Sequence, residues 1–151
     1  MININKKRLY LIPLIIIVIS LDQITKYIIF IDNINLVNKD FILFTIDYVK
    51  NYGAAFNIFN GNRIFLSLVS IILSILLIYL IIKKINTKSI EPFGYSFILA
   101  GSIGNGIDRI LKGYVIDFIN LNYINFPVFN IADLSINIGL IIFLYTLVKS
   151  K

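Results

Sequence analysis

Asp108 and Asp133 are the residues whose type and spacing suggest chemistry most directly. Asp108 follows Asn105 by three residues, and Asp133 follows Asn130 by three, so each carboxylate has an amide about one helical turn away. Two carboxyl groups within hydrogen-bonding distance titrate apart and share one proton near neutral pH. The ionised member takes a proton from an attacking water, while the protonated member polarises a peptide carbonyl. Such a pair hydrolyses a peptide bond with no metal and no covalent intermediate.

The residue types that are missing exclude most other catalytic sites. The chain contains no Cys and no His. Thiolate and imidazole metal sites, cysteine nucleophiles and Ser-His-Asp triads are therefore excluded, and proton transfer is left to carboxylates, Lys or Tyr. A Ser-Lys dyad is disfavoured, because Lys26 has Asp22 as its expected partner. We predict neither a metal nor a cofactor.

Asp22 and Lys26 have a structural interpretation that we prefer. They stand four residues apart, which places them on one helix face as an ion pair. Near the outer end of a membrane span, such a pair stabilises helix packing. The functional alternative is that the pair positions the substrate or a loop.

Gly101, Asn105 and Asp108 share one helical stripe, because their spacings are four and three. The structural interpretation is a seam of small residues, in which Gly101 serves only close packing and Arg109 caps the helix end. Arg109 can extend to the lipid headgroups, whereas an inward carboxylate at Asp108 needs another reason to be there. Asp108 therefore remains a candidate for chemistry.

Four apolar segments are long enough to cross a membrane as helices. The chain is 58% hydrophobic, and its mean hydropathy of +0.88 is far above that of ordinary soluble proteins. A membrane helix needs roughly 20 apolar residues, and such segments cover about residues 9–31, 64–82, 93–111 and 131–148. We predict an all-α membrane protein of four transmembrane helices that forms a single domain over residues 1–151.

The connection between the first two predicted spans carries strand signals. Residues from Phe41 to Val49 are rich in β-branched and aromatic types and are bounded by Asn, Lys and Asp. We expect short strands within about residues 36–60 of this connection. Tyr114 to Leu121 is a further extended segment that could pair with the same sheet.

The distribution of basic residues predicts the orientation of the spans. The net charge of +6, from 14 Lys and Arg against 8 Asp and Glu, is concentrated at the two termini and in the connection at 83–90. This pattern places both termini in the cytoplasm and does not suggest a nucleic-acid site. The third helix then ends near Asp108 and the fourth begins near Asp133, both close to the outer face. The structural interpretation is that Asn130 is the N-cap of the fourth helix and that Asp133 stabilises its positive N-terminus. Because both helix ends lie near the outer face, Asp108 and Asp133 can also face each other as a carboxylate pair.

Four separated strings resemble lipoprotein signal peptidase, also called signal peptidase II. Their order and spacing match that family over nearly the whole chain. The strings are Leu21-Asp-Gln-Ile-Thr-Lys26, Asn51-Tyr-Gly-Ala-Ala-Phe56, Gly101-Ser-Ile-Gly-Asn-Gly-Ile-Asp-Arg109 followed by Gly113-Tyr-Val-Ile-Asp-Phe118, and Phe129-Asn-Ile-Ala-Asp133. Two departures are Asn57, where family members often carry Ser, and Leu134, where a small polar residue is common.

The resemblance implies roles for the residues in these strings. Asp108 and Asp133 would be the catalytic dyad. The first outer loop would form a small extracytoplasmic β-cradle that holds Asn51 and Gly53 near the site. The other supporting residues would be Asn105, Arg109 and Asn130 beside the dyad, Asp22 and Lys26 at the end of the first helix, and Gly101.

The resemblance also implies a reaction and its setting. The substrate would be a bacterial prolipoprotein, cut just before its diacylglyceryl-modified cysteine by a monomeric enzyme in the cytoplasmic membrane. Globomycin-type cyclic peptides would inhibit the reaction, and the partners would be the substrate and membrane lipids. The alternative functions are a small ion or proton transporter and a structural membrane subunit. Gathering of the polar residues near one face argues against a transport path.

Overall fold

The computed structural model describes residues 10–31, 35–54, 58–84 and 89–149. The predictions that involve the first nine residues, Phe56, Asn57, Lys88 and Lys151 lie outside this part of the chain. The helices are α1 (Leu11–Ile31), α2 (Arg63–Lys84), α3 (Glu91–Leu111) and α4 (Ile131–Lys149), and the strands are β1 (Lys39–Asp40), β2 (Phe44–Asn51) and β3 (Val115–Leu121). Helices thus occupy all four ranges that the sequence predicts as spans.

Helices α1, α2 and α4 are long and apolar enough to cross a membrane, as judged over the described residues. Large aliphatic side chains such as Ile16, Ile72, Ile75 and Ile141 are exposed along them. An exposed apolar surface of this extent is typical of a protein surrounded by lipid. The structure therefore supports membrane insertion through these three helices.

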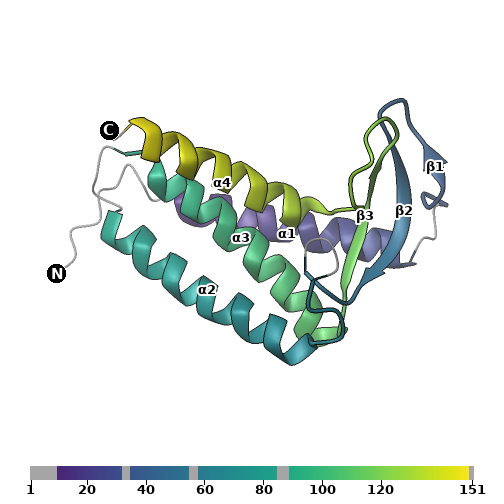
Figure 1. Cartoon of the computed structure of the whole chain (residues 1–151), viewed down its shortest axis with the longest axis horizontal. Helices are drawn as coiled ribbons and strands as arrows, with labels where there is room; N and C mark the ends of the chain where they lie inside the picture. Colours follow the sequence, from purple (N-terminus) through teal and green to yellow (C-terminus); the bar gives the residue numbers. More distant parts are fainter. Residues whose placement is uncertain (1–9, 32–34, 55–57, 85–88, 150–151) are drawn as a thin grey trace.

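Helix α3 differs from the other helices because most of its residues are buried. It packs against α1, α2 and α4 (Figure 1), and its buried positions include Ser96, Ser102, Asn105 and Asp108. Polar side chains are tolerated there because neighbouring helices satisfy them. The same residues lower the hydropathy of α3. Of the four predicted spans, α1, α2 and α4 are thus apolar enough to cross a membrane, and α3 is not, as judged over the described residues.

The end of α3 reverses the chain toward the sheet. The backbone N–H groups of Lys112 and Gly113 both donate to the Asp108 carbonyl oxygen, at 2.8 and 3.2 Å. Gly113 has φ +88°, a left-handed conformation that glycine adopts without strain and that ends many helices. This turn directs β3 back across the end of the helices.

The three strands form an antiparallel sheet of order β1-β2-β3. The predictions of strand near 41–49 and of an extended segment at 114–121 are confirmed, and the latter pairs with β2 as proposed. The register places Asp117 opposite Val49 and Val115 opposite Asn51, so Asp117 and Asn51 share one face of the sheet. The sheet lies at the end of the helices where α1 finishes and α4 begins (Figure 1).

An apolar cluster holds the sheet against the helices. Ile116 and Phe118 of β3 are buried with Ile29 of α1, and Tyr48 and Ile131 pack against them. Because the strand alternates its side chains between two faces, Ile116 and Phe118 point one way and Asp117 points the other. Packing of the apolar face therefore fixes where Asp117 projects.

Candidate active site

A cavity of about 440 Å³ lies between the sheet and the helices. Two aspartates line it, Asp117 from β3 and Asp133 from α4, together with Asn51, Asn105 and Arg109. The remaining wall is largely apolar and includes Val69, Leu73 and Ile136, and also Phe126 to Phe129. The cavity thus joins a small group of polar side chains to an apolar chamber, the usual composition of a binding site for an organic ligand.

Asp133 is held at the start of α4 by hydrogen bonds from two asparagines. Asn105 Nδ2 donates to Asp133 Oδ1 at 2.8 Å, and the Asn130 backbone N–H donates to Asp133 Oδ2 at 3.2 Å. In return, the Asp133 backbone N–H donates to Asn130 Oδ1 at 2.9 Å. This reciprocal cap satisfies two groups at the helix start. The capping interpretation of Asn130 and Asp133 is correct, and it does not remove Asp133 from the cavity.

Asp117 is the carboxylate that the sequence analysis missed. Its side chain is buried, with Asn51 Nδ2 at 2.9 Å from Oδ2 and Asn130 Nδ2 at 2.6 Å from Oδ1. Burial, and next the negative charge of Asp133, raise the pKa of Asp117 to about 7, against the opposing effect of the two asparagine hydrogen bonds. Asp117 therefore titrates near neutral pH beside a second carboxylate.

A sequence signal for Asp117 was available. It stands inside the string Gly113-Tyr-Val-Ile-Asp-Phe118, as a single carboxylate in an otherwise apolar strand. Asp117 lies outside the four predicted spans, and it is within an apolar span that a charged residue stands out most clearly.

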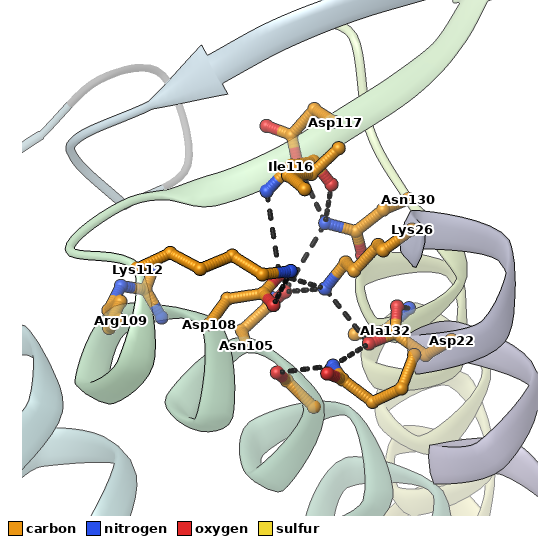
Figure 2. A network of polar contacts seen from close by, with 12 residues as sticks. Asp22, Lys26, Asn105, Asp108, Arg109, Lys112, Ile116, Asp117, Asn130 and Ala132 are labelled. Atoms are coloured by element: carbon orange, nitrogen blue, oxygen red, sulfur yellow. Dashed lines mark hydrogen bonds and ion pairs between the residues drawn. The ribbon is translucent and has the colours of Figure 1, made fainter. Parts of the chain in front are cut away.

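Asp108 occupies a different position from the one predicted. It is fully buried, with Lys26 Nζ at 3.0 Å from Oδ2 and Lys112 Nζ at 2.9 Å from Oδ1 (Figure 2). The Ile116 backbone N–H is a further donor at 3.5 Å. Asp108 is not among the residues that line the cavity, and a water could reach its oxygens only by displacing a lysine. This placement argues against the predicted Asp108–Asp133 pair, because Asp117 and not Asp108 lines the cavity with Asp133.

Asp22 and Lys26 form the ion pair that their spacing predicts, with Lys26 Nζ at 2.9 Å from Asp22 Oδ2. Asp22 Oδ1 also accepts a hydrogen bond from the Ala132 backbone N–H at 2.9 Å, which links α1 to the first turn of α4. Both side chains are fully buried. The pair lies behind the cavity rather than in its wall.

Arg109 and Gly53 connect α3 with the segment after β2. Arg109 Nη2 donates to the Gly53 carbonyl oxygen at 2.9 Å, and the Gly53 N–H donates to Asn51 Oδ1 at 2.9 Å. The two hydrogen bonds hold this segment, which continues to Ala54 in the cavity wall. The structure thus brings Asn51, Gly53 and Arg109 together.

Gly101 serves helix packing. A Cβ atom added there would collide with the Ala132 carbonyl oxygen and lie 2.7 Å from Ile136 Cγ1, both on α4. Glycine therefore allows α3 and α4 to approach closely enough for Asn105 to reach Asp133.

Comparisons with known proteins identify the family. The family described as signal peptidase (SPase) II matches residues 14–149. The lipoprotein signal peptidase of Gloeothece citriformis is 46% identical over 129 residues, covering 83% of this chain and 80% of the relative. That of Enterococcus faecalis is 39% identical over 137 residues, covering 88% and 84%.

Two solved structures share the fold. One is a bacterial membrane enzyme solved by the in meso method at 2.3 Å, with a TM-score of 0.83 and 36% identity over 93% of this chain and 88% of that chain. A second, solved by the same method at 1.9 Å, has a TM-score of 0.79 and 36% identity, covering 94% of each chain. By the extent of these matches, the chain belongs to the signal peptidase II family.

Proposed function

We propose that this protein is a membrane aspartyl endopeptidase that removes signal peptides from diacylglyceryl-modified prolipoproteins, with Asp117 and Asp133 as its catalytic pair. The observation that carries the proposal is that both carboxylates line one cavity, where each accepts hydrogen bonds from asparagine. Membership of the signal peptidase II family supports the substrate class. The carboxylate pair supplies the mechanism.

The reaction follows from a pair that holds one proton. The ionised aspartate removes a proton from water as the water oxygen bonds to the scissile carbonyl carbon, and the protonated aspartate donates to the carbonyl oxygen. When the resulting tetrahedral species collapses, the carbon–nitrogen bond breaks and the amine nitrogen receives a proton from the aspartate that had taken it from water. As the carbonyl group re-forms, the hydroxyl that had accepted the proton of the other aspartate returns it to that aspartate. One water is consumed, and the pair returns to its starting proton count.

The surroundings of the pair suit a substrate fixed at the membrane surface. We propose that α3 spans the membrane with α1, α2 and α4, that both termini are cytoplasmic, and that the sheet lies at the outer face of a bacterial cytoplasmic membrane. A signal helix in the bilayer and a lipidated cysteine would then both hold the scissile bond at the depth of the cavity. The aliphatic wall formed by Val69, Leu73 and Ile136 suits the apolar end of the signal peptide.

A cleavage assay tests this function. The purified protein, in lipid nanodiscs, is incubated with a synthetic prolipoprotein peptide that carries a diacylglyceryl cysteine, and the products are identified by mass spectrometry. We expect one cut, on the amino side of the modified cysteine, and inhibition by globomycin-type cyclic peptides. Absence of cleavage, or a cut at another bond, would overturn the proposal.

A transporter is the alternative from another class. The buried charges of Asp22, Lys26 and Asp108 pair with one another at the end of the helices that carries the sheet, whereas a transport path needs polar groups along the depth of the membrane. We therefore expect no ion or proton flux above background in liposomes that contain the protein.

A further inference from the structure

Lys26 is a fully buried lysine whose ammonium group contacts three acceptors (Figure 2). Its Nζ lies 2.9 Å from Asp22 Oδ2, 2.9 Å from Asn105 Oδ1 and 3.0 Å from Asp108 Oδ2. An ammonium group has three N–H donors, so these contacts use all of them. The two carboxylates compensate the charge, and the third contact reaches a neutral amide.

The contact with Lys26 sets the orientation of the Asn105 amide. An ammonium group donates and never accepts, so the atom of Asn105 that faces Lys26 must be the carbonyl oxygen. The NH₂ group then points the other way, where Nδ2 donates to Asp133 Oδ1 at 2.8 Å. Asn130 Nδ2 also donates to Asn105 Oδ1, at 3.2 Å. Rotation of the amide by half a turn would bring its NH₂ group against these two donors and its oxygen against a carboxylate.

We propose that Lys26 is a positioning residue of the peptidase reaction, which acts through Asn105 to hold the Asp133 carboxylate in place for attack. Lys26 is not among the residues that line the cavity, and its hydrogen-bonded link to Asp133 runs through the Asn105 amide. Against the larger effect of burial, its positive charge also lowers the pKa of Asp117, so the test must separate loss of the hydrogen bond from loss of the charge. The inference rests on the proposed function, in which Asp133 is catalytic. It assigns Lys26 a role beyond its ion pair with Asp22.

Lys112 provides a matched control in the same cluster. Its Nζ lies 2.9 Å from Asp108 Oδ1, so it pairs with the same carboxylate as Lys26 but on the opposite oxygen. Within the described part of the chain, its contact is to Asp108 and not to Asn105. Loss of Lys112 therefore removes a charge from the cluster and leaves the Asn105 amide oriented.

The variants are designed to keep the buried charge balanced. Removal of Lys26 alone would leave buried carboxylates uncompensated, which threatens folding. Lys26→Met is therefore combined with Asp22→Asn, whose Oδ1 can still accept from the Ala132 N–H. Lys26→Gln in the same background supplies an uncharged donor toward Asn105. Asp22→Asn alone and Lys112→Met are the controls, and each rate is divided by the concentration of folded protein from a thermal melt.

We expect kcat to fall when the side chain at position 26 can no longer donate a hydrogen bond to Asn105. Misplacement of a reacting group by about 1 Å lowers a rate by roughly a hundredfold, and we expect a kcat loss of that order for the Lys26→Met double variant with KM within about twofold. The Lys26→Gln double variant should recover much of this loss and Lys112→Met should stay close to the wild type, while Asp22→Asn alone supplies the baseline from which the losses of both double variants are counted. Equal rates for the Met and Gln variants, or a loss confined to KM, would overturn the inference.

A double-mutant cycle with Asn105→Ala provides the second readout. If Lys26 acts through Asn105, the Lys26→Met substitution should add little once the amide is gone, because coupled residues are not additive. If the kcat losses of the Lys26→Met and Asn105→Ala substitutions multiply when they are combined, Lys26 acts independently of Asn105, and the inference is contradicted. Failure of the proposed function has a different signature, which is retained turnover in Asp117→Asn or Asp133→Asn.

Discussion

The Asn130 amide donates to Asp117 Oδ1 at 2.6 Å, and this bond ties the strand that carries one aspartate to the cap of the helix that carries the other. Asn130 thereby contacts both members of the proposed pair, since its backbone N–H also donates to Asp133 Oδ2. One residue thus sets the position of β3 relative to the first turn of α4. In the proposed function, the sheet thus supplies one of the two aspartates and the helices supply the other.

The pKa of Asp117 predicts the alkaline limit of activity. Burial and then the charge of Asp133 raise this pKa from 3.8 to about 7, so the carboxyl keeps its proton up to neutral pH and loses it above. Above about pH 7 the pair holds two negative charges and lacks its acid. We expect kcat/KM for the diacylated peptide to fall as pH rises through about 7. A rate that stays flat to pH 9 would contradict this assignment.

Asn51→Leu should move that limit to higher pH. The Asn51 amide donates to Asp117 Oδ2 and favours the ionised form, so its removal raises the pKa of Asp117 further. The control is Asn120→Leu, which removes a similar bond in the same sheet, from Asn120 to Asp47 Oδ2 at 2.8 Å. We expect the pH profile of kcat/KM to shift for Asn51→Leu and to stay in place for Asn120→Leu. A downward shift for Asn51→Leu would refute the explanation.

Gly101→Ala should separate α3 from α4. The added methyl group would meet the Ala132 carbonyl oxygen and Ile136 Cγ1, and overpacking of this kind costs roughly 1–3 kcal/mol. Gly106→Ala is the control, because its Cβ would lie 3.2 Å from Ser70 Cβ, where a small adjustment suffices. Thermal melts in detergent should show a larger drop for Gly101→Ala, with lower kcat because Asn105 is drawn away from Asp133. Equal melting temperatures would count against a packing role for Gly101.

Arg109→Lys should raise KM more than it lowers kcat. Arg109 Nη2 holds the Gly53 carbonyl oxygen at 2.9 Å, and lysine cannot reproduce the planar geometry of the guanidinium group. The segment that includes Gly53 and Ala54, of which Ala54 lies in the cavity wall, would then lose its tie to α3. Initial-rate measurements over a range of peptide concentrations distinguish the two constants, and an unchanged KM would contradict the role.

The sequence predicted the helices and the sheet because each has a local signal. Long apolar runs gave helix ranges within a few residues of α1 to α4, and the β-branched segment after the first span gave β2. The Asp22–Lys26 pair was also predictable, since spacing of four residues fixes neighbours on a helix.

The partner of Asp133 was not predictable from spacing alone. Asp108 and Asp133 were paired because both lie near the same helix ends, but side-chain direction around α3 depends on packing with α1. In the structure, Lys26 and Lys112 occupy the oxygens of Asp108. The turn at Gly113 brings β3 over the cavity, so the strand residue Asp117 lines it together with Asp133.

Paired substitutions at Asp117 and Asp108 test the central claim most directly. The measurement is kcat per folded molecule for cleavage of the diacylated peptide by Asp117→Asn, Asp133→Asn and Asp108→Asn. Loss of an acid or base group costs roughly a hundredfold to ten-thousandfold, and we expect at least this for Asp117→Asn and Asp133→Asn with melting temperatures near that of the wild type. Asp108→Asn should lower the melting temperature, because it leaves Lys26 and Lys112 without their shared carboxylate, and should reduce kcat less. Near-normal turnover by folded Asp117→Asn would contradict the account.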